Sequence, residues 1–130
     1  MKNNVVKLIR YLYYLSLIVL FILYLFPGSI IGYIFYGNLT KQPNLIDNPF
    51  GTSINHFFYF FYLTILASFF ITEKKKLISF SFILFISIFL EIFHFIIPNR
   101  SFELKDLIAN ISGVLLVFIF LRIFKWRKIY

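Results

Sequence analysis

The chain has 130 residues, of which 61% are hydrophobic and only 14% are charged, and its mean hydropathy is +0.88. A soluble domain of this length has too little interior to bury so much apolar surface, so lipid is the expected solvent. The absence of cysteine excludes a disulfide framework and a thiolate metal site. The formal charge of +8 does not predict nucleic-acid binding, because membrane topology explains it better.

Four apolar stretches are long enough to cross a bilayer, which takes about 20 residues in a helix. They are residues 8–27, 54–72, 77–97 and 106–124. We therefore predict an all-α fold: a polytopic four-transmembrane-helix bundle in a single domain, residues 1–130. The connection after the first span contains a short apolar stretch, residues 29–37, that either continues the helix beyond a kink at Pro27 or lies flat at the interface.

The basic residues predict the orientation of the bundle. Three precede or begin the first span, three separate the second span from the third, and four end the chain, which makes ten of the 13 Lys and Arg residues. Only Lys41, Arg100 and Lys105 fall on the other side. Since basic loops stay in the cytoplasm, both termini are predicted to be cytoplasmic, in a multi-pass protein of the bacterial inner membrane.

Polar side chains gather at the outer ends of the predicted spans. Charged groups at membrane depth are expensive and usually face the bundle interior, so these residues predict one outer-leaflet polar site. Its candidate members are His56, Tyr59, Glu91, His94, Arg100, Asp106 and Asn110. His56 is either a hydrogen-bonded interfacial residue or a ligand-binding or acid–base group.

Glu91 and His94 are three residues apart, so they share one face of the third span. The pair resembles part of a metal site, but only His56 or Asp106 is available as a third ligand. We therefore predict no metal and no other cofactor.

Arg100 lies in the outer loop, six residues before Asp106, which is its expected partner. The pair would either fasten the loop to the fourth span or leave the guanidinium to hold a phosphate or carboxylate with two hydrogen bonds. In the fourth span, Asn110 is expected to bridge helices. Ala109 and Gly113 form a small-xxx-small pair that lets another helix approach closely.

The order of these residues resembles the VanZ-like family of small bacterial membrane proteins. The matching segments are NHFFYFFYL from Asn55, EIFHFIIPNR from Glu91 and DLIANISG from Asp106, within a resemblance that covers about residues 47–113. Position by position, the matches are His56, Glu91, Pro98, Arg100, Asp106, Asn110 and Gly113. Two positions depart from the family: His94 stands where Gln is usual, and Asn55 where Lys is commoner.

This resemblance implies a cell-envelope membrane protein with a link to resistance to the glycopeptide teicoplanin, and no settled reaction. The expected ligand of the polar site is an amphiphile or a lipid headgroup. Membrane lipids, a lipid-linked envelope precursor or a lipoglycopeptide are the expected partners, with no nucleic acid, and oligomerisation stays open. The alternative is an integral-membrane enzyme that acts on a lipid-linked envelope substrate, with Glu91 or His56 as general base and Arg100 stabilising phosphate charge. The sequence offers no closely spaced nucleophile and base, which favours binding over catalysis.

Overall fold

The structure is a computed structural model that describes residues 2–43, 48–70 and 73–126, with side chains described for 4–43, 48–69 and 79–124. Within these ranges the chain is all-helical and contains no strand, which confirms the predicted all-α class. The helices are α1 (Lys2–Leu25), α2 (Ile30–Tyr36), α3 (Ser53–Phe70), α4 (Glu73–Phe93) and α5 (Leu104–Trp126).

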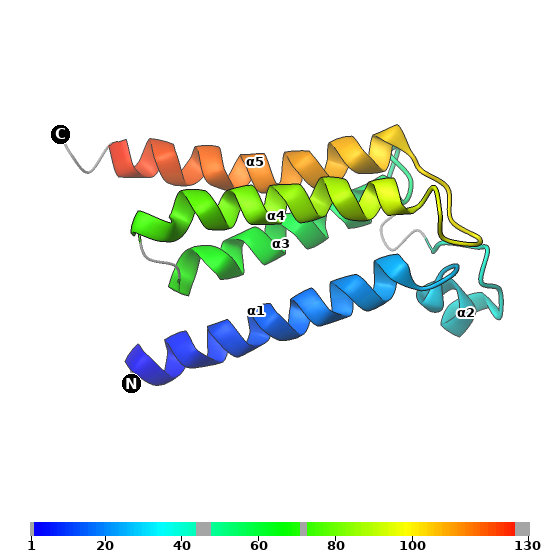
Figure 1. Cartoon of the computed structure of the whole chain (residues 1–130), viewed down its shortest axis with the longest axis horizontal. Coiled ribbons are helices and arrows are strands. Elements are labelled where there is room, and N and C mark those ends of the chain that lie inside the picture. The colour runs from blue at the N-terminus through cyan, green and yellow to red at the C-terminus, as the bar shows by residue number, and fades with distance from the viewer. Residues whose placement is uncertain (1, 44–47, 71–72, 127–130) are drawn as a thin grey trace.

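The four long helices run side by side as a bundle, and α2 is a short helix beyond one end of it (Figure 1). The connection between α4 and α5 lies at the same end as α2, which we call the α2 end. The start of α1 and the end of α5 lie at the opposite end (Figure 1). The most extensive helix–helix interface joins α3 to α5, whereas α1 packs chiefly on α3, and α4 on α5.

The helix limits differ from the predicted spans in ways that local chemistry explains. The first helix begins six residues earlier than predicted and ends at Leu25, before Pro27 and Gly28. Gly28 has a φ of 99°, which glycine adopts readily. The third long helix, α4, ends at Phe93 and not at residue 97, so His94 lies in the turn that follows it. The predicted span 54–72 includes residues 71–72, which are outside the described ranges.

The apolar stretch after Pro27 forms the separate helix α2, so it does not continue α1 beyond a kink. The side chain of Ser29 caps α2 by accepting a hydrogen bond from the amide of Gly32, and Gly37 ends the helix in the left-handed conformation. A β-carbon at Gly32 would meet the carbonyl oxygen of Lys41, so only glycine lets the following loop fold back against α2.

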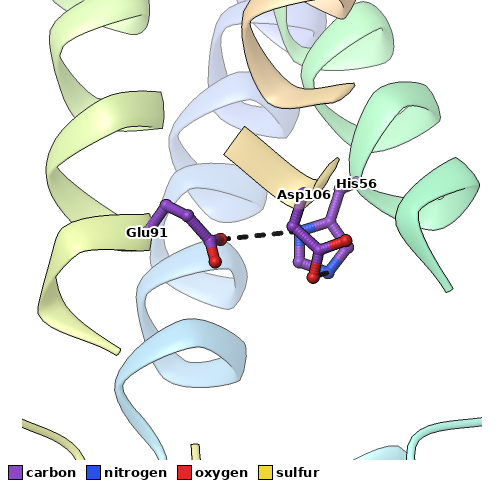
Figure 2. Close-up of side chains that lie close together, drawn as sticks. All are labelled: His56, Glu91 and Asp106. Carbon is purple, nitrogen blue, oxygen red and sulfur yellow. Dashed lines mark ion pairs between the residues drawn. The ribbon is translucent and has the colours of Figure 1, made fainter. Parts of the chain in front are cut away.

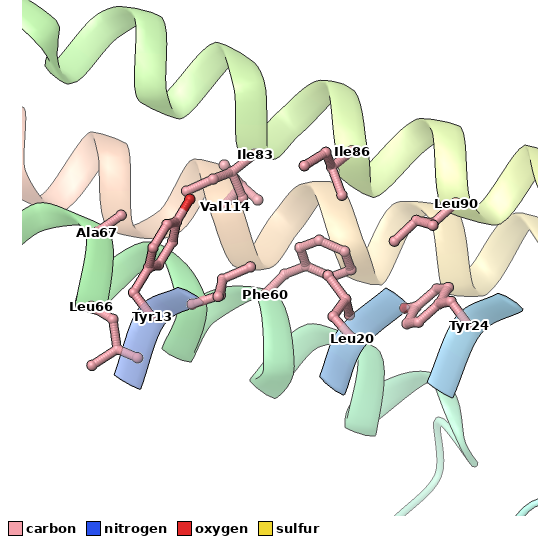
Figure 3. Close-up of a cluster of buried hydrophobic side chains, with 11 residues drawn as sticks. Tyr13, Leu20, Tyr24, Phe60, Leu66, Ala67, Ile83, Ile86, Leu90 and Val114 are labelled. Carbon is pink, nitrogen blue, oxygen red and sulfur yellow. The ribbon is translucent and has the colours of Figure 1, made fainter. Parts of the chain in front are cut away.

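The core is a narrow apolar column inside the four long helices (Figure 3). It consists of Tyr13, Leu20, Tyr24, Phe60, Leu63, Leu66, Ala67, Ile83, Ile86, Leu90 and Val114. Many other large apolar side chains point outward from the same helices, as Ile18, Phe85 and Ile119 do. A soluble protein rarely exposes so much contiguous apolar surface, so the exterior suits contact with lipid.

Two helices are long and apolar enough to cross a membrane, over Asn4–Leu25 and Leu104–Phe124. The two helices between them contain shorter apolar stretches in the described residues, Ser53–Phe69 and Ser79–Phe93. By length and composition the chain is therefore a candidate membrane protein.

Gly113 sets the separation between α3 and α5. A β-carbon built on Gly113 would lie 2.5 Å from the carbonyl oxygen of Phe57 and 2.9 Å from the amide nitrogen of Phe61. Both obstacles are backbone atoms of α3, which cannot rotate away. This close approach is the one that the small pair Ala109–Gly113 predicted, with Gly113 at the contact and Ala109 partly exposed.

Replacing Gly113 with alanine is expected to destabilise the bundle. Alanine improves helix propensity by about 1 kcal/mol, but forcing α3 and α5 apart costs about 1–3 kcal/mol, so the steric effect should dominate. The measurement is the midpoint of thermal unfolding in detergent, together with the abundance of the variant in membranes. The control is Ser112→Ala on the exposed face of the same helix, and an unchanged midpoint for Gly113→Ala would contradict the packing described.

Candidate functional site

Side chains from four helices meet in a buried polar cluster at the α2 end. Figure 2 shows three of them, His56, Glu91 and Asp106. Tyr24 comes from the last turn of α1, His56 from the first turn of α3, and Glu91 from the last turn of α4. Asp106 and Asn110 come from the beginning of α5. Each helix thus contributes its polar residue at the same depth of the bundle.

His56 contacts carboxylates on two sides. Its Nε2 atom lies 3.4 Å from Oδ2 of Asp106, and its Nδ1 atom lies 4.0 Å from Oε2 of Glu91. Asp106 is held in place by the hydroxyl of Ser53, which donates to Oδ1 at 2.5 Å. The first turn of α3 and the first turns of α5 are therefore fastened to each other by charge and hydrogen bonds.

Glu91 is fully buried, with 0% of its surface exposed. Its Oε1 atom accepts from the backbone amide of Glu103 and lies 3.2 Å from Nδ1 of His94. Its Oε2 atom has no hydrogen-bond partner among the residues that the structure describes, and neither has Nε2 of His94. Burying a polar atom without a hydrogen-bond partner is costly, so these two atoms are the most unusual features of the cluster.

His56, Glu91 and Asp106 each offer one ligand atom, and these three atoms all lie within 4.8 Å of one another (Figure 2). The sequence analysis named Glu91 with His94, and His56 or Asp106 as a third ligand, whereas the group that the structure assembles contains both His56 and Asp106 beside Glu91 and does not include His94. Figure 2 shows the carboxylate of Glu91 directed toward the His56 ring.

Tyr24 is a central member of this site that the sequence analysis did not single out. Its hydroxyl lies 2.6 Å from Nδ1 of His56 and donates to Oδ1 of Asn110 at 3.0 Å. Its ring also stacks on His94, with centroids 5.3 Å apart. In the sequence Tyr24 is one aromatic among many, and its only signal is its place one turn before Pro27, at the same depth as the other polar residues.

Arg100 does not pair with Asp106 as expected, but reaches across to the end of α1. Its Nη2 atom donates to the carbonyl oxygen of Leu23 at 2.5 Å, and its Nε atom donates to the carbonyl oxygen of Phe26 at 3.4 Å. The last carbonyl groups of a helix lack partners within the helix, and a cation also complements the negative end of the helix dipole. Arg100 thus fastens the loop between α4 and α5 to α1 and not to Asp106 of α5.

The remaining predicted site residues are placed as follows. Asn110 is fully buried and bridges helices, since its Nδ2 atom donates to the carbonyl oxygen of Ser87 at 3.2 Å. Tyr59 lies apart from the charged cluster, and its hydroxyl donates to the backbone of Ser16 in α1 at 2.9 Å. The structure therefore brings His56, Glu91, His94, Asp106 and Asn110 together, whereas Arg100 and Tyr59 contact the backbone of α1.

A cavity of about 490 Å³ opens beside this cluster, between α1, α2 and α3. Most of its wall is apolar, and Leu20, Leu23 and Ile31 contribute to it. The polar side chains on its wall include His56, His94 and Arg100. An apolar space with a few convergent polar groups is typical of a binding site for a small amphiphilic molecule.

The loop that precedes α5 adds charges outside the helices. Partial burial lowers the pKa of Arg100 from its ordinary value, although a guanidinium still carries its charge at neutral pH. Burial and the neighbouring carboxylates of Asp106 and Glu91 raise the pKa of Glu103. Three carboxylates and one guanidinium therefore lie close together at the α2 end.

The fold and site together define an all-helical protein with a buried cluster of histidine and carboxylate beside an apolar cavity. Comparisons with protein-family models, with curated proteins and with solved structures found no match to this chain. The resemblance to the VanZ-like family consequently stays an interpretation of the motif residues.

The variant Tyr24→Phe is expected to lower stability by about 1–3 kcal/mol, because it leaves polar atoms of His56 and Asn110 buried without their shared partner. The measurement is thermal unfolding in detergent. Tyr11→Phe is the control, since Tyr11 is exposed on the same helix. Equal melting temperatures for the two variants would show that the Tyr24 hydroxyl has no role in holding α1 to the bundle.

Proposed function

We propose that the chain is a multi-pass protein of the bacterial inner membrane, with α1, α3, α4 and α5 as its four spans. At about 1.5 Å per residue, helices of 18 to 24 residues suit a hydrocarbon layer of about 30 Å. The outward-facing apolar side chains support this arrangement. The concentration of Lys and Arg near the ends opposite α2 supports cytoplasmic termini.

This topology predicts which positions an impermeant thiol reagent can label, and the absence of native cysteine makes single-cysteine variants unambiguous. Ser101→Cys, in the loop at the α2 end, should react in intact cells. Asn4→Cys, at the other end of α1, should react only after the cells are permeabilised. The reverse pattern would invert the proposed orientation, and labelling of both in intact cells would refute the spanning of α1.

The function that the site supports best is binding of an amphiphile or lipid at the outer face of the membrane, in a VanZ-like protein of the cell envelope. The single observation that carries this proposal is the apolar cavity with His56, His94 and Arg100 on its wall. An acyl chain would occupy the apolar part, where it loses contact with water. A polar headgroup would lie against the histidines and the guanidinium, which can donate hydrogen bonds to a phosphate or carboxylate.

The resemblance to the VanZ-like family suggests which amphiphiles to test. Teicoplanin carries a lipid tail, and lipid-linked envelope precursors combine a chain with a charged headgroup. Either would match the combination of apolar and polar lining. A role in glycopeptide resistance would follow from binding such a molecule at the outer leaflet.

The alternative function is that of an integral-membrane enzyme that acts on a lipid-linked substrate. The contact of His56 with Asp106 favours it, because a carboxylate orients a histidine that acts as a general base. Ser53, however, donates its proton to Asp106 and not to His56. The hydroxyl is therefore not activated as a nucleophile, so binding remains the better supported function.

Filling the cavity should abolish amphiphile binding. Ile31→Trp adds a large side chain at the cavity wall, whereas Ile34→Trp adds the same side chain on the exposed face of α2, where Ile34 is 71% exposed. Lipids and added teicoplanin that copurify in mild detergent are identified by mass spectrometry. We expect the wild type and Ile34→Trp to retain a ligand and Ile31→Trp to lose at least about 90% of it, since displaced apolar contacts have no replacement.

Equal ligand content in all three proteins would contradict the cavity as the binding site. A parallel measurement of teicoplanin susceptibility in cells that carry each variant links binding to the envelope. Hydrolysis of an added lipid-linked precursor by the wild type, lost in His56→Gln, would instead support the enzymatic alternative.

A further inference from the structure

The orientation of one amide determines where the protons lie around His56. Nδ2 of Asn110 donates to the carbonyl oxygen of Ser87, so Oδ1 of Asn110 faces Tyr24 and can only accept. Tyr24 therefore uses its hydroxyl proton on Asn110. Its oxygen must then accept from Nδ1 of His56, 2.6 Å away. Nδ1 consequently carries a proton, and Nε2 is the atom that faces Asp106.

This arrangement places Nε2 of His56 against an atom that is also an acceptor. In the neutral ring with a proton on Nδ1, Nε2 has a free lone pair. It lies 3.4 Å from Oδ2 of Asp106, whose other oxygen already accepts from Ser53. Two acceptors at this distance repel each other unless a proton or a cation lies between them. A proton on the ring or on the carboxyl group would fill this position, and so would a bound cation.

The surroundings of Glu91 favour a bound cation over a proton between His56 and Asp106. A proton between Nε2 of His56 and Asp106 gives no hydrogen bond to Oε2 of Glu91, which is buried, lies 4.0 Å from Nδ1 of His56 and has no hydrogen-bond partner among the described residues. Figure 2 shows this carboxylate directed into the cluster. An ion with two positive charges would balance both carboxylates and would also give this oxygen a partner.

We propose that His56, Glu91 and Asp106 bind a divalent transition-metal ion, with Zn²⁺ as the best match. One donor atom of each residue lies within 4.8 Å of the other two. Donors held at about 2.0–2.2 Å by a tetrahedral zinc lie about 3.4 Å apart. The three donor atoms lie within 4.8 Å of one another, so side-chain shifts of no more than about 1.4 Å would close the site. Three protein ligands would leave a fourth position for water or another ligand.

The donor set selects among metal ions. Calcium takes about six to eight oxygen ligands, and magnesium prefers an octahedral shell of oxygens that includes several waters. One imidazole nitrogen with two carboxylate oxygens suits zinc better, as a four-coordinate ion that accepts nitrogen and oxygen donors.

Each proposed ligand also has an outer hydrogen bond that fixes its orientation, as ligands of metal sites usually do. Tyr24 holds Nδ1 of His56, Ser53 holds Oδ1 of Asp106, and the amide of Glu103 holds Oε1 of Glu91. His56 also lines the cavity. The ion would therefore lie beside the polar end of any molecule in the cavity and could bind a phosphate or carboxylate oxygen there.

The test measures binding of Zn²⁺ alone to the full chain in detergent, purified with an affinity tag that contains no histidine. The protein is stripped with a chelator, which is then removed, and affinity is measured by competition with a fluorescent zinc chelator. Bound metal is counted by mass spectrometry. We expect one zinc per chain, and a loss of more than about 100-fold in affinity for Glu91→Gln and Asp106→Asn, since even outer partners contribute about 10–100-fold.

Two further variants sharpen the test. Tyr24→Phe removes an outer partner and should weaken zinc binding by about 10–100-fold. Ser112→Ala changes an exposed side chain of α5 outside the cluster, so it should bind zinc as the wild type does. Magnesium should not compete with zinc at equal concentration.

Failure of the wild type to bind stoichiometric zinc would overturn the proposal, as would unchanged affinity in both Glu91→Gln and Asp106→Asn. Should those variants not fold, as judged by circular dichroism, the wild type decides the question alone. Its melting temperature must rise with added zinc and not with magnesium, because a ligand of the native state stabilises that state. No amphiphile is present, so the result bears on the ion site and not on amphiphile binding.

Discussion

His56 of α3 lies beside the carboxylates of Asp106 in α5 and Glu91 in α4. It also shares a hydrogen bond with the hydroxyl of Tyr24 in α1. Polar groups that leave water lose several kcal/mol, on the order of 2–7, unless they find partners. In a small bundle with an apolar exterior, these partners come from other helices and from the loop that connects α4 to α5. The α2 end is thus built around the mutual satisfaction of a few buried polar atoms, and the positions of α1, α4 and α5 there depend on it.

Two features fasten α1, which packs mainly on α3 and has the fewest contacts with its neighbours among the four long helices. Tyr24 joins the interior of α1 to His56 and Asn110, and Arg100 holds the final carbonyl groups of the same helix. The cavity lies beside this joint. Any molecule that enters it would contact the residues that fix α1, so ligand binding and the position of the first helix are physically linked.

The fold class and much of the site could be predicted from the sequence. Long apolar runs predicted the four long helices, because the length of such a run can be read from consecutive residues without knowledge of the tertiary structure. The isolated polar residues in those runs predicted that His56, Glu91, Asp106 and Asn110 share one environment, because lipid tolerates such groups poorly. Gly113 was predicted at a close helix contact, and the structure places it against the backbone of α3. The four-span topology and the VanZ-like function stay predictions.

The sequence by itself therefore determined the helices and the depth at which the polar residues lie, since both follow from hydropathy along the chain. Tertiary structure decided the partners. In the structure, Arg100 donates to a carbonyl oxygen of α1 and does not pair with Asp106, and Tyr24 lies at the centre of the cluster. Oε2 of Glu91 has no hydrogen bond among the described residues. Partner choice depends on how helices rotate and approach one another, and packing between distant segments sets those angles, which no local pattern encodes.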